Sequence, residues 1–435
     1  MNEDRTSAGV EERAVARYAE LYGQSKGVLM LAVDLFFVVD AGHLGADHLS
    51  LFQQAYEQMY AAVPMMAPEL VACIVETDLG LPAAELFAEF EYAPIAFGSI
   101  GQVHRAVLHD GRAVAVKIQY PGVADVIRAD MSNPELVVSI WRYLQAAARM
   151  KMPNSREIAN EIAARIAEQI DYRHEAANIT AFSRLFAGHP YLRIPEVIDG
   201  RCGERVLTMT YLDGLNLEQA RQADQDLRDS WAEAIYRFFC GSYRHGSLFH
   251  GDPHPDNLRF GTDGSIGIVD FGCVQTLSEF RRRHFAALPR AAMSGTKQDI
   301  ARAMIEAGFV WSNPDVTPDD LHRWWQPLLS PLVNEQPVQF GGPDFLDLAR
   351  MMLLMHDHPQ LGDMHVPSEH MFAGRLSVSF MSTLVALGAR FHARGCIDDM
   401  DGVAEPITDM GRQHIAWVRR RGLPFGLDDH TARPS

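Results

Sequence analysis

Hydrophobic positions recur with helical spacing from residue 11 to residue 87, and the scarcity of β-branched alternation there favours helix over strand. From residue 93 the pattern changes. Two β-rich runs, 102–108 and 113–119, flank an Asp110-Gly111 turn and predict a hairpin. We therefore expect a helical N-terminal region followed by a small sheet.

A second helical stripe follows the hairpin. Isoleucines recur at every fourth position from 158 to 170, and Asn154 with Glu157 resembles a capping box at the start of this helix. Further runs predict two strands (193–197 and 205–211), a helix at 217–243 and helices beyond 278. A polar, turn-rich segment at 250–272 is expected to contain a short apolar hairpin.

These elements predict an α+β protein in three parts. We expect a helical N-terminal extension at residues 1–90, a small β-rich lobe at 91–213 and a helical lobe at 214–435.

Composition and charge exclude several classes of function. The chain has 435 residues and is 47% hydrophobic, so it can bury a sizeable core. Its formal net charge of −17 makes nucleic-acid binding a disfavoured function, because a negative surface repels phosphate backbones. Its five cysteines have no C-x-x-C spacing, which predicts free thiols in a reducing cytoplasm. The longest apolar stretch, 28–39, is shorter than the ~20 residues of a membrane span, and no secretory signal is expected at the N-terminus.

The polar segment contains the strongest chemical motifs. Asp252 and Asn257 have the D-x-x-x-x-N spacing of a kinase catalytic loop, and Asp270 begins a D-F-G string. Mg²⁺ takes oxygen ligands such as those of Asn257 and Asp270, while Asp252 would orient or deprotonate the acceptor. The sequence leaves two alternatives: a surface turn, and a zinc site at His250 and His254.

A glycine-rich string lies upstream. Residues 96–103 follow the kinase G-x-G-x-x-G-x-V pattern, with alanine in place of the first glycine. Glycines allow backbone amides to approach phosphates. The candidate nucleotide-binding residues in this string are Ala96, Gly98, Ser99, Gly101 and Val103.

Lys117 ends a V-A-V-K string, where a kinase lysine holds the nucleotide phosphates. The chain contains only four lysines among 39 basic residues, although an exposed lysine at a strand end remains the alternative. Glu168, Asp171 and Glu175 are its candidate partners, expected on one face of the isoleucine-striped helix. We favour Glu175.

The strand at 205–211 leads into a linker that would contact adenine. By their order along the chain, Met209, Tyr211 and Leu212 are the candidates for this hinge.

Taken together, the strings at 94–106, 116–123, 171–178 and in the polar segment resemble the UbiB/AarF family of atypical kinases over roughly residues 20–290. The resemblance implies a protein-kinase-like bilobal fold with a helical N-terminal extension. It also implies binding of ATP (or ADP) with Mg²⁺, and an ATPase or kinase activity linked to isoprenoid-quinone or other lipid metabolism.

The chain departs from the family pattern at three places. Phe97 and Gly98 replace two alanines of the family's A-A-A-S loop, which leaves the nucleotide preference open. The K-x-G-Q signature is missing near residues 31–34, and Gln169 replaces the first acid of E-x-D. We hypothesise that Leu31 and Gln169 replace a charge pair by an apolar contact, so that the extension docks but gates the site less tightly.

Three functions fit these residues: an ATP-binding atypical kinase or ATPase, a small-molecule phosphotransferase of the aminoglycoside or choline kinase type, and a non-catalytic nucleotide-dependent switch or lipid-handling protein. The first is favoured. An adenine nucleotide is the expected partner, with a lipid or quinone-like molecule as a further one. Basic clusters at 281–283 and 419–421 and the helix at 28–39 would supply peripheral membrane contact. For the two basic clusters we favour the interpretation as solvated helix faces, and for the helix at 28–39 we favour packing on the core.

Overall fold

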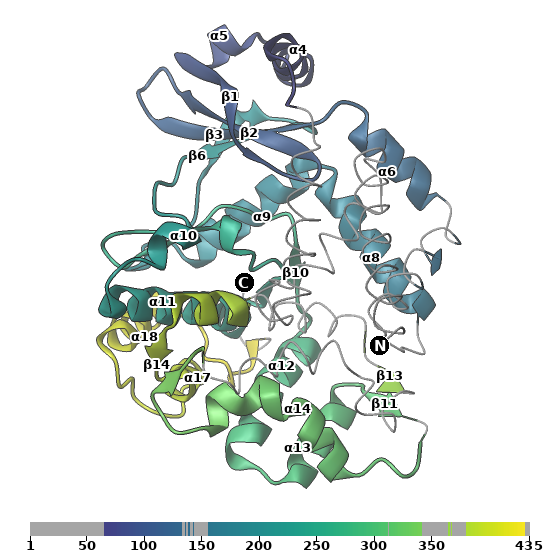
Figure 1. Ribbon diagram of the computed structural model, residues 1–435, viewed down its shortest axis with the longest axis vertical. Coiled ribbons are helices and arrows are strands. Elements are labelled where there is room, and N and C mark those ends of the chain that lie inside the picture. Colours follow the sequence, from purple (N-terminus) through teal and green to yellow (C-terminus); the bar gives the residue numbers. More distant parts are fainter. Residues whose placement is uncertain are drawn as a thin grey trace, which may run out of the picture. The chain divides into compact units, whose positions relative to one another are not determined.

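The computed structural model describes residues 65–132, 155–311, 313–341 and 380–430, with a few isolated positions between these ranges (Figure 1). The described chain divides into two compact units. The sheet unit contains residues 65–132, 159–177 and 196–211, and the helical unit contains 155–158, 178–195 and the described residues from 212 onward. The helical region expected before residue 65, with Leu31, lies outside the described residues.

The sheet unit is built on one five-stranded antiparallel sheet. Its strands are β1 (Glu89–Phe97), β2 (Gly101–Val107), β3 (Ala113–Gln119), β5 (Val197–Cys202) and β6 (Val206–Thr210), in the spatial order β1-β2-β3-β6-β5. The central strand β3 is the most buried: Val114, Val116 and Ile118 are fully enclosed. Lys117 therefore lies on a strand whose backbone is hydrogen-bonded to a neighbouring strand on each side, β2 and β6.

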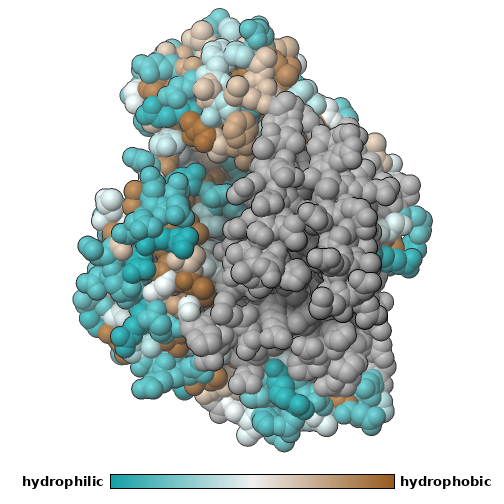
Figure 2. All heavy atoms as spheres, viewed as in Figure 1, coloured by the Kyte–Doolittle hydropathy of each residue, from teal (hydrophilic) through white to brown (hydrophobic). Residues whose placement is uncertain are grey.

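The predicted hairpin is present, because β2 pairs with β3 around the Asp110-Gly111 turn. The sequence pattern did not reveal β1. This edge strand leaves Tyr92, Ile95 and Phe97 exposed, so it lacks the alternation of a half-buried strand. Figure 2 shows apolar surface, in tan and brown, over the sheet unit at the top of the view.

Helices α4 (Pro68–Leu79), α5 (Ala83–Leu86) and α6 (Val123–Met131) belong to the sheet unit, with most of α8 (Ser155–Gln169) and the start of α9 (Tyr172–Leu185). Helix α4 contacts β1, β3, β5 and β6. Helices α4 and α5, which precede the sheet, are therefore part of the same folded unit.

The expectation that Glu168, Asp171 and Glu175 share one face of a single helix is wrong. Helix α8 ends at Gln169 and α9 begins at Tyr172, so Asp171 lies between two helices. Its carboxylate accepts a hydrogen bond from the backbone N–H of Arg173 at 2.9 Å. Aspartate favours helix starts for this reason. The apolar stripe conceals the break because its last member, Ile170, keeps the helical spacing one residue beyond the end of α8.

The helical unit is organised around α11 (Gln225–Gly246), whose side chains are largely buried. The helix predicted at 217–243 is divided, because a short α10 (Leu217–Ala220) precedes α11. The other helices in the described part of this unit are α12 (Glu279–Ser294), α13 (Lys297–Glu306), α14 (Pro318–Val333), α17 (Ala393–Met400) and α18 (Asp409–Arg421). Side-chain caps begin four of them, at Ser278, Thr296, Thr317 and Thr408.

Short strands complete the helical unit. They are β4 (Leu192–Arg193), β7 (Leu248–His250), β8 (Leu258–Phe260), β9 (Ile266–Ile268), β10 (Val274–Thr276), β11 (Val310–Trp311), β12 (Val338–Gln339), β13 (Met364–His365) and β14 (Arg390–Phe391). Strands β8 and β9 form the apolar hairpin expected inside the polar segment, and β7 pairs with β10. The β7–β10 pairing joins the two ends of the segment that carries the catalytic-loop and D-F-G strings, and the β8–β9 hairpin lies inside it.

Buried arginines attach α11 to the end of α17. Arg237 donates to both carboxylate oxygens of Asp399 at 2.8 Å, and Arg244 donates to Asp401 at 2.8 Å. All four side chains are almost completely buried. Removing one partner would leave an uncompensated buried charge, so these pairs hold α11 and the end of α17 together.

Candidate functional site

The Lys117 ammonium group contacts a carboxylate on helix α9. Its Nζ donates to Oε1 of Glu175 at 2.5 Å, and the two side chains are 9% and 6% exposed. Of the three acids that the sequence offered, Glu175 is the one that the structure brings to Lys117. An ion pair this deeply buried carries a large desolvation penalty, so it is unlike the many surface pairs of the chain.

The other two acids have arginine partners. Arg165 donates to Glu168 at 2.6 Å, and burial raises the pKa of the Glu168 carboxyl. Burial alone would raise the pKa of the Asp171 carboxyl as well, but hydrogen bonds from Arg173 outweigh it and hold that pKa below its usual value.

The glycine-rich string forms the turn between β1 and β2. Ala96 pairs with Val103 across the two strands, and the N–H of Gly98 donates to the carbonyl of Gly101 at 2.8 Å. Ser99 lies within the turn closed by this hydrogen bond. The five candidate nucleotide-binding residues of the string therefore belong to one tight hairpin.

The two glycines of this turn have different surroundings. A Cβ at Gly98 would meet only the carbonyl oxygen of Gly101, at 3.6 Å. A Cβ at Gly101 would lie 2.3 Å from the Ile118 carbonyl oxygen and 2.9 Å from the Tyr172 hydroxyl. Gly101 is therefore required by packing against β3, in addition to any role toward phosphate.

The hinge candidates lie at the end of β6. Met209 is buried within that strand and pairs with Ala115. The N–H of Tyr211 donates to the carbonyl of Ala113 at 3.0 Å, so this donor is already used inside the sheet. The division between the two units falls between Tyr211 and Leu212.

The remaining candidate residues lie in the helical unit, at the open end of the β8–β9 hairpin. Asn257 and Asp270 flank this hairpin, and the N–H of Val269 donates to the Asn257 carbonyl at 3.0 Å. The Nδ2 of Asn257 donates to Oδ2 of Asp252 at 3.0 Å. The Gly272 N–H donates to Asp270 Oδ1 at 3.0 Å.

The side-chain oxygens of Asn257 and Asp270 suit a hard divalent cation. Because Nδ2 of Asn257 faces Asp252, the amide oxygen is the atom of that side chain that a cation would take. Carboxylate and amide oxygens are the protein ligands that Mg²⁺ prefers. Asn257 and Asp270 therefore have the chemistry to hold Mg²⁺ with the phosphates of a nucleotide.

His250 links the two strings of the segment. It is buried, its Nε2 donates to the main-chain oxygen of Asp270 at 2.7 Å, and its Nδ1 accepts from the N–H of Asp252 at 3.2 Å. These two bonds assign the proton to Nε2. The imidazole thus orients the backbone on either side of the candidate catalytic residues.

The same contacts disfavour the zinc alternative, since both ring nitrogens of His250 have hydrogen-bond partners. Nδ1 of His254 accepts from the N–H of Asp256 at 3.2 Å. Within the described part of the chain, no group of three or more His, Cys, Asp or Glu side chains has a metal-binding arrangement.

Aromatic packing supports the D-F-G string. Phe271 is fully buried against Phe182 and His250, with ring centroids 5.1 and 5.2 Å apart. Its carbonyl accepts a hydrogen bond from Asn178 Nδ2 at 2.9 Å. Asn178 lies on α9, three residues after Glu175, and the sequence motifs gave it no role.

The basic clusters are largely engaged within the helical unit. Arg282 is buried and pairs with Glu279, which also pairs with Arg283. Arg419 pairs with Glu405, and Arg421 donates to main-chain carbonyls. None of the described helices is long and apolar enough to span a bilayer.

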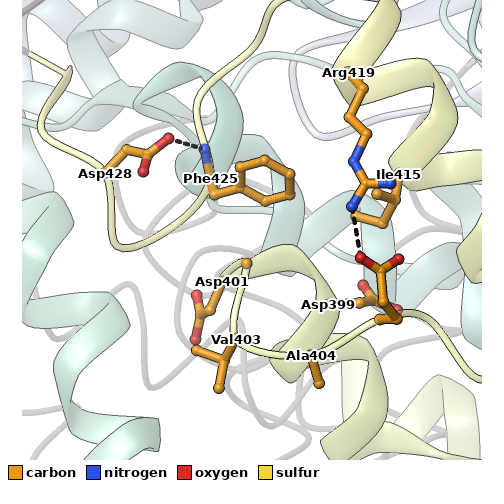
Figure 3. Close-up of a pocket in the computed structure, with 10 residues that line it drawn as sticks. Asp399, Asp401, Val403, Ala404, Ile415, Arg419, Phe425 and Asp428 are labelled. Carbon is orange, nitrogen blue, oxygen red and sulfur yellow. Dashed lines mark hydrogen bonds and ion pairs between the residues drawn. The ribbon is translucent and has the colours of Figure 1, made fainter.

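A cavity of about 320 Å³ lies elsewhere in the helical unit, between α17, α18 and the C-terminal residues (Figure 3). Its lining includes Asp399, Asp401 and Phe425. The two carboxylates already pair with buried arginines, and the cavity contains none of the candidate site residues.

The chain matches the model of a known family. Residues 58–304 match the ABC1 atypical kinase-like domain, which is more than half of the chain. The chain belongs to this family. The resemblance to UbiB/AarF kinases is thus confirmed, and so is the α+β, protein-kinase-like fold class.

Relatives of this ABC1 chain occur in plants and animals. It is 29% identical to Protein ACTIVITY OF BC1 COMPLEX KINASE 7, chloroplastic, of Arabidopsis thaliana, over 69% of this chain and 44% of that protein. It is 28% identical to Atypical kinase COQ8B, mitochondrial, of Rattus norvegicus, over 59% of this chain and 48% of that protein. These alignments span less than half of either relative.

A solved structure shows the same fold. The complex structure of Rv3197-erythromycin from Mycobacterium tuberculosis superposes with a TM-score of 0.63 at 23% identity, covering 93% of this chain and all of that one.

Proposed function

We propose that this ABC1-family chain binds ATP or ADP with Mg²⁺ and catalyses phosphoryl transfer or ATP hydrolysis. The observation that carries the proposal is the buried ion pair between Lys117 and Glu175. A carboxylate from a helix that fixes a strand lysine is the arrangement in which kinases hold nucleotide phosphates. Four lysines in 435 residues make a coincidental placement there improbable.

Each residue has a distinct task in this proposal. Lys117 holds the phosphates and Glu175 fixes the lysine, while the turn from Ala96 to Val103 covers the nucleotide and Met209, Tyr211 and Leu212 border the adenine. Asn257 and Asp270 hold Mg²⁺, which would neutralise charge on the phosphates when bound. Asp252 orients the acceptor hydroxyl or water and receives its proton.

The acceptor is a separate part of the proposal. The family includes relatives named Protein ACTIVITY OF BC1 COMPLEX KINASE 7 and Atypical kinase COQ8B. On this basis we propose a link to isoprenoid-quinone or lipid metabolism, with a lipid or quinone-like molecule modulating or accepting the reaction.

Turnover and binding can be tested together. ADP release from ATP should require Mg²⁺, and Asp270→Asn should lower it roughly a hundredfold or more. The matched control is Asp256→Asn, the same change at an exposed position of the same segment. Each protein is assayed with and without anionic vesicles or a quinone-like phenol.

Nucleotide binding is measured separately by thermal shift, since a ligand that binds only the native state raises its apparent stability. A Mg²⁺-dependent shift without turnover under any condition would favour the non-catalytic switch. No shift with any nucleotide would overturn the proposal.

A further inference from the structure

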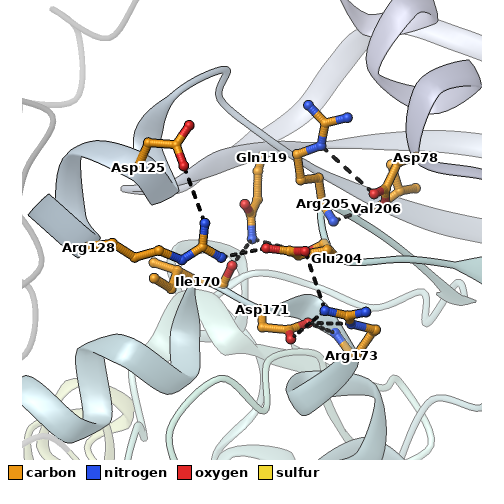
Figure 4. Close-up of polar contacts among 10 residues, drawn as sticks. All are labelled: Asp78, Gln119, Asp125, Arg128, Ile170, Asp171, Arg173, Glu204, Arg205 and Val206. Carbon is orange, nitrogen blue, oxygen red and sulfur yellow. Dashed lines mark hydrogen bonds and ion pairs between the residues drawn. The ribbon is translucent and has the colours of Figure 1, made fainter.

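The turn between β5 and β6 is fixed to the end of helix α4 (Figure 4). Oδ2 of Asp78 on α4 accepts hydrogen bonds from the N–H groups of Arg205 and Val206, both at 2.9 Å. Gly203 permits this approach, because a Cβ there would lie 2.2 Å from that oxygen. The turn therefore has a defined position relative to α4.

Glu204, in the same turn, contacts two further helices. One carboxylate oxygen accepts from Arg128 on α6 at 2.5 Å, and the other accepts from Arg173 on α9 at 3.4 Å. Its carbonyl accepts from the N–H of Tyr172, the first residue of α9, at 3.0 Å. A carboxylate at this end of a helix also interacts favourably with the helix dipole.

A strand side chain reaches the same junction. Gln119 follows Lys117 by two residues on β3, and its Nε2 donates to the carbonyls of Ile170 at 2.9 Å and Glu204 at 3.4 Å. The junction thus joins the strand of Lys117 to the first turn of α9, which contains Glu175.

We propose that Glu204 is a positioning residue that holds the first turn of α9 so that Glu175 meets Lys117. The inference rests on the proposed function, in which that ion pair prepares Lys117 for the nucleotide. Glu204 is 37% exposed and Arg173 is 61% exposed, and exposed pairs of this kind are individually weak. Loss of the Glu204 charge therefore shifts the position of α9 without unfolding the chain.

Helix α4 is coupled to the ion pair by the same route. Because Asp78 fixes one side of the turn and Glu204 the other, a displacement of α4 releases the start of α9. Every contact on this route lies within the sheet unit.

The test uses the scarcity of lysine in the full chain. An amine-reactive ester modifies lysines in proportion to their access, and peptide mass spectrometry measures each lysine separately. The Lys117 side chain is 9% exposed and is expected to react slowly, whereas Lys297, with 48% of its side chain exposed, is the internal reference. Glu204→Gln should raise the modification rate of Lys117 about fivefold and leave that of Lys297 unchanged.

Matched variants separate positioning from general loosening. Glu204→Asp keeps the charge and should restore most of the protection. Glu91→Gln removes a comparably exposed ion pair with Arg105 on the β1–β2 hairpin and should leave Lys117 as slow as in the wild type. If circular dichroism shows that Glu204→Gln does not fold, Arg173→Gln takes its place with the same expected outcome.

Equal Lys117 rates in the wild type and in the folded variant would overturn the inference. A rise that Glu91→Gln reproduces would overturn it as well. No nucleotide is present in this experiment, so its outcome is independent of whether the chain binds or hydrolyses ATP.

Discussion

His250 donates through Nε2 to the main-chain oxygen of Asp270 at 2.7 Å. His250→Phe would keep the aromatic packing against Phe182 and Phe271 but would leave the Asp270 carbonyl and the Asp252 N–H without this partner. We expect the free energy of unfolding to fall by about 1–3 kcal/mol. Urea denaturation measures this change.

The control for His250→Phe is His254→Phe. His254 is half-buried and caps only the single turn at Pro255–Asn257, so its replacement should lower the free energy of unfolding by less, about 1 kcal/mol. Equal stability of His250→Phe and the wild type would show that the hydrogen bonds of His250 do not stabilise the fold.

Gly98→Ala and Gly101→Ala form a matched pair in the turn between β1 and β2. Neither glycine has a positive φ, so the space around the new Cβ decides the outcome. Gly101→Ala must displace β3, because the Cβ would lie 2.3 Å from the Ile118 carbonyl oxygen. We expect it to lower the free energy of unfolding by roughly 1–3 kcal/mol or more, whereas Gly98→Ala should leave it within about 0.5 kcal/mol.

The folded Gly98→Ala protein then addresses nucleotide preference, since this change moves the turn toward the alanine-rich family pattern. Thermal shifts with Mg²⁺ and either ATP or ADP should differ from those of the wild type. An unstable Gly98→Ala with a stable Gly101→Ala would contradict the packing argument.

Three buried histidines form a chain in the helical unit and predict a dependence of stability on pH. His189 donates to His414 at 3.0 Å, His414 donates to His245 at 3.0 Å, and His245 donates to the carbonyl of Pro424 at 2.8 Å. This chain of donors requires all three rings to be neutral. Burial lowers the pKa of His189 to about 2 and that of His245 to about 4, and it lowers the pKa of His414 well below its usual value.

The sign of the effect follows from these directions. The unfolded chain binds protons at the three rings below a pH of about 6.5, while the folded chain does not, so stability is complete above that pH and falls as the pH drops toward 4. Each ring contributes at most ~1.4 kcal/mol per pH unit. Arg237, Arg193 and Arg244 oppose protonation of the folded state, whereas Asp401 favours it.

Denaturation at pH 5, 6, 7 and 8 measures the slope of the free energy of unfolding against pH. His414→Gln should make it shallower by about one third, because one of three similar titrations disappears. His109→Gln, at an exposed histidine of the β2–β3 turn, should leave it unchanged. A free energy of unfolding that is constant from pH 5 to pH 8 would refute the prediction.

Local patterns in the sequence predicted those parts of the fold that local interactions determine. The Asp110-Gly111 turn between alternating apolar runs predicted the β2–β3 hairpin, and the apolar hairpin inside the polar segment was also expected. The motif around Lys117 and the choice of Glu175 led to a pair that the structure brings together. Their roles in catalysis remain predictions.

The rest depends on contacts between distant residues. The break at Asp171 is hidden in the isoleucine pattern, because the last isoleucine, Ile170, keeps the helical spacing although α8 has already ended at Gln169. Glu204 carries no motif-level signal, and the hydrogen bonds from His250 to the motif residues Asp252 and Asp270 depend on how the backbone folds around it. Edge strand β1 escaped detection because Tyr92, Ile95 and Phe97 are apolar but exposed, which breaks the alternation of a half-buried strand.

The attachment of α4 to the sheet bears on where a stable fragment of this chain can begin. Gln102 accepts a hydrogen bond from the N–H of Met66 at 3.2 Å, and Asp78 serves two N–H groups of the β5–β6 turn. A protein shortened to start at residue 91 would lack both partners and expose the apolar surface beneath α4. For expression trials, Met66 therefore sets the latest sensible first residue of the sheet unit.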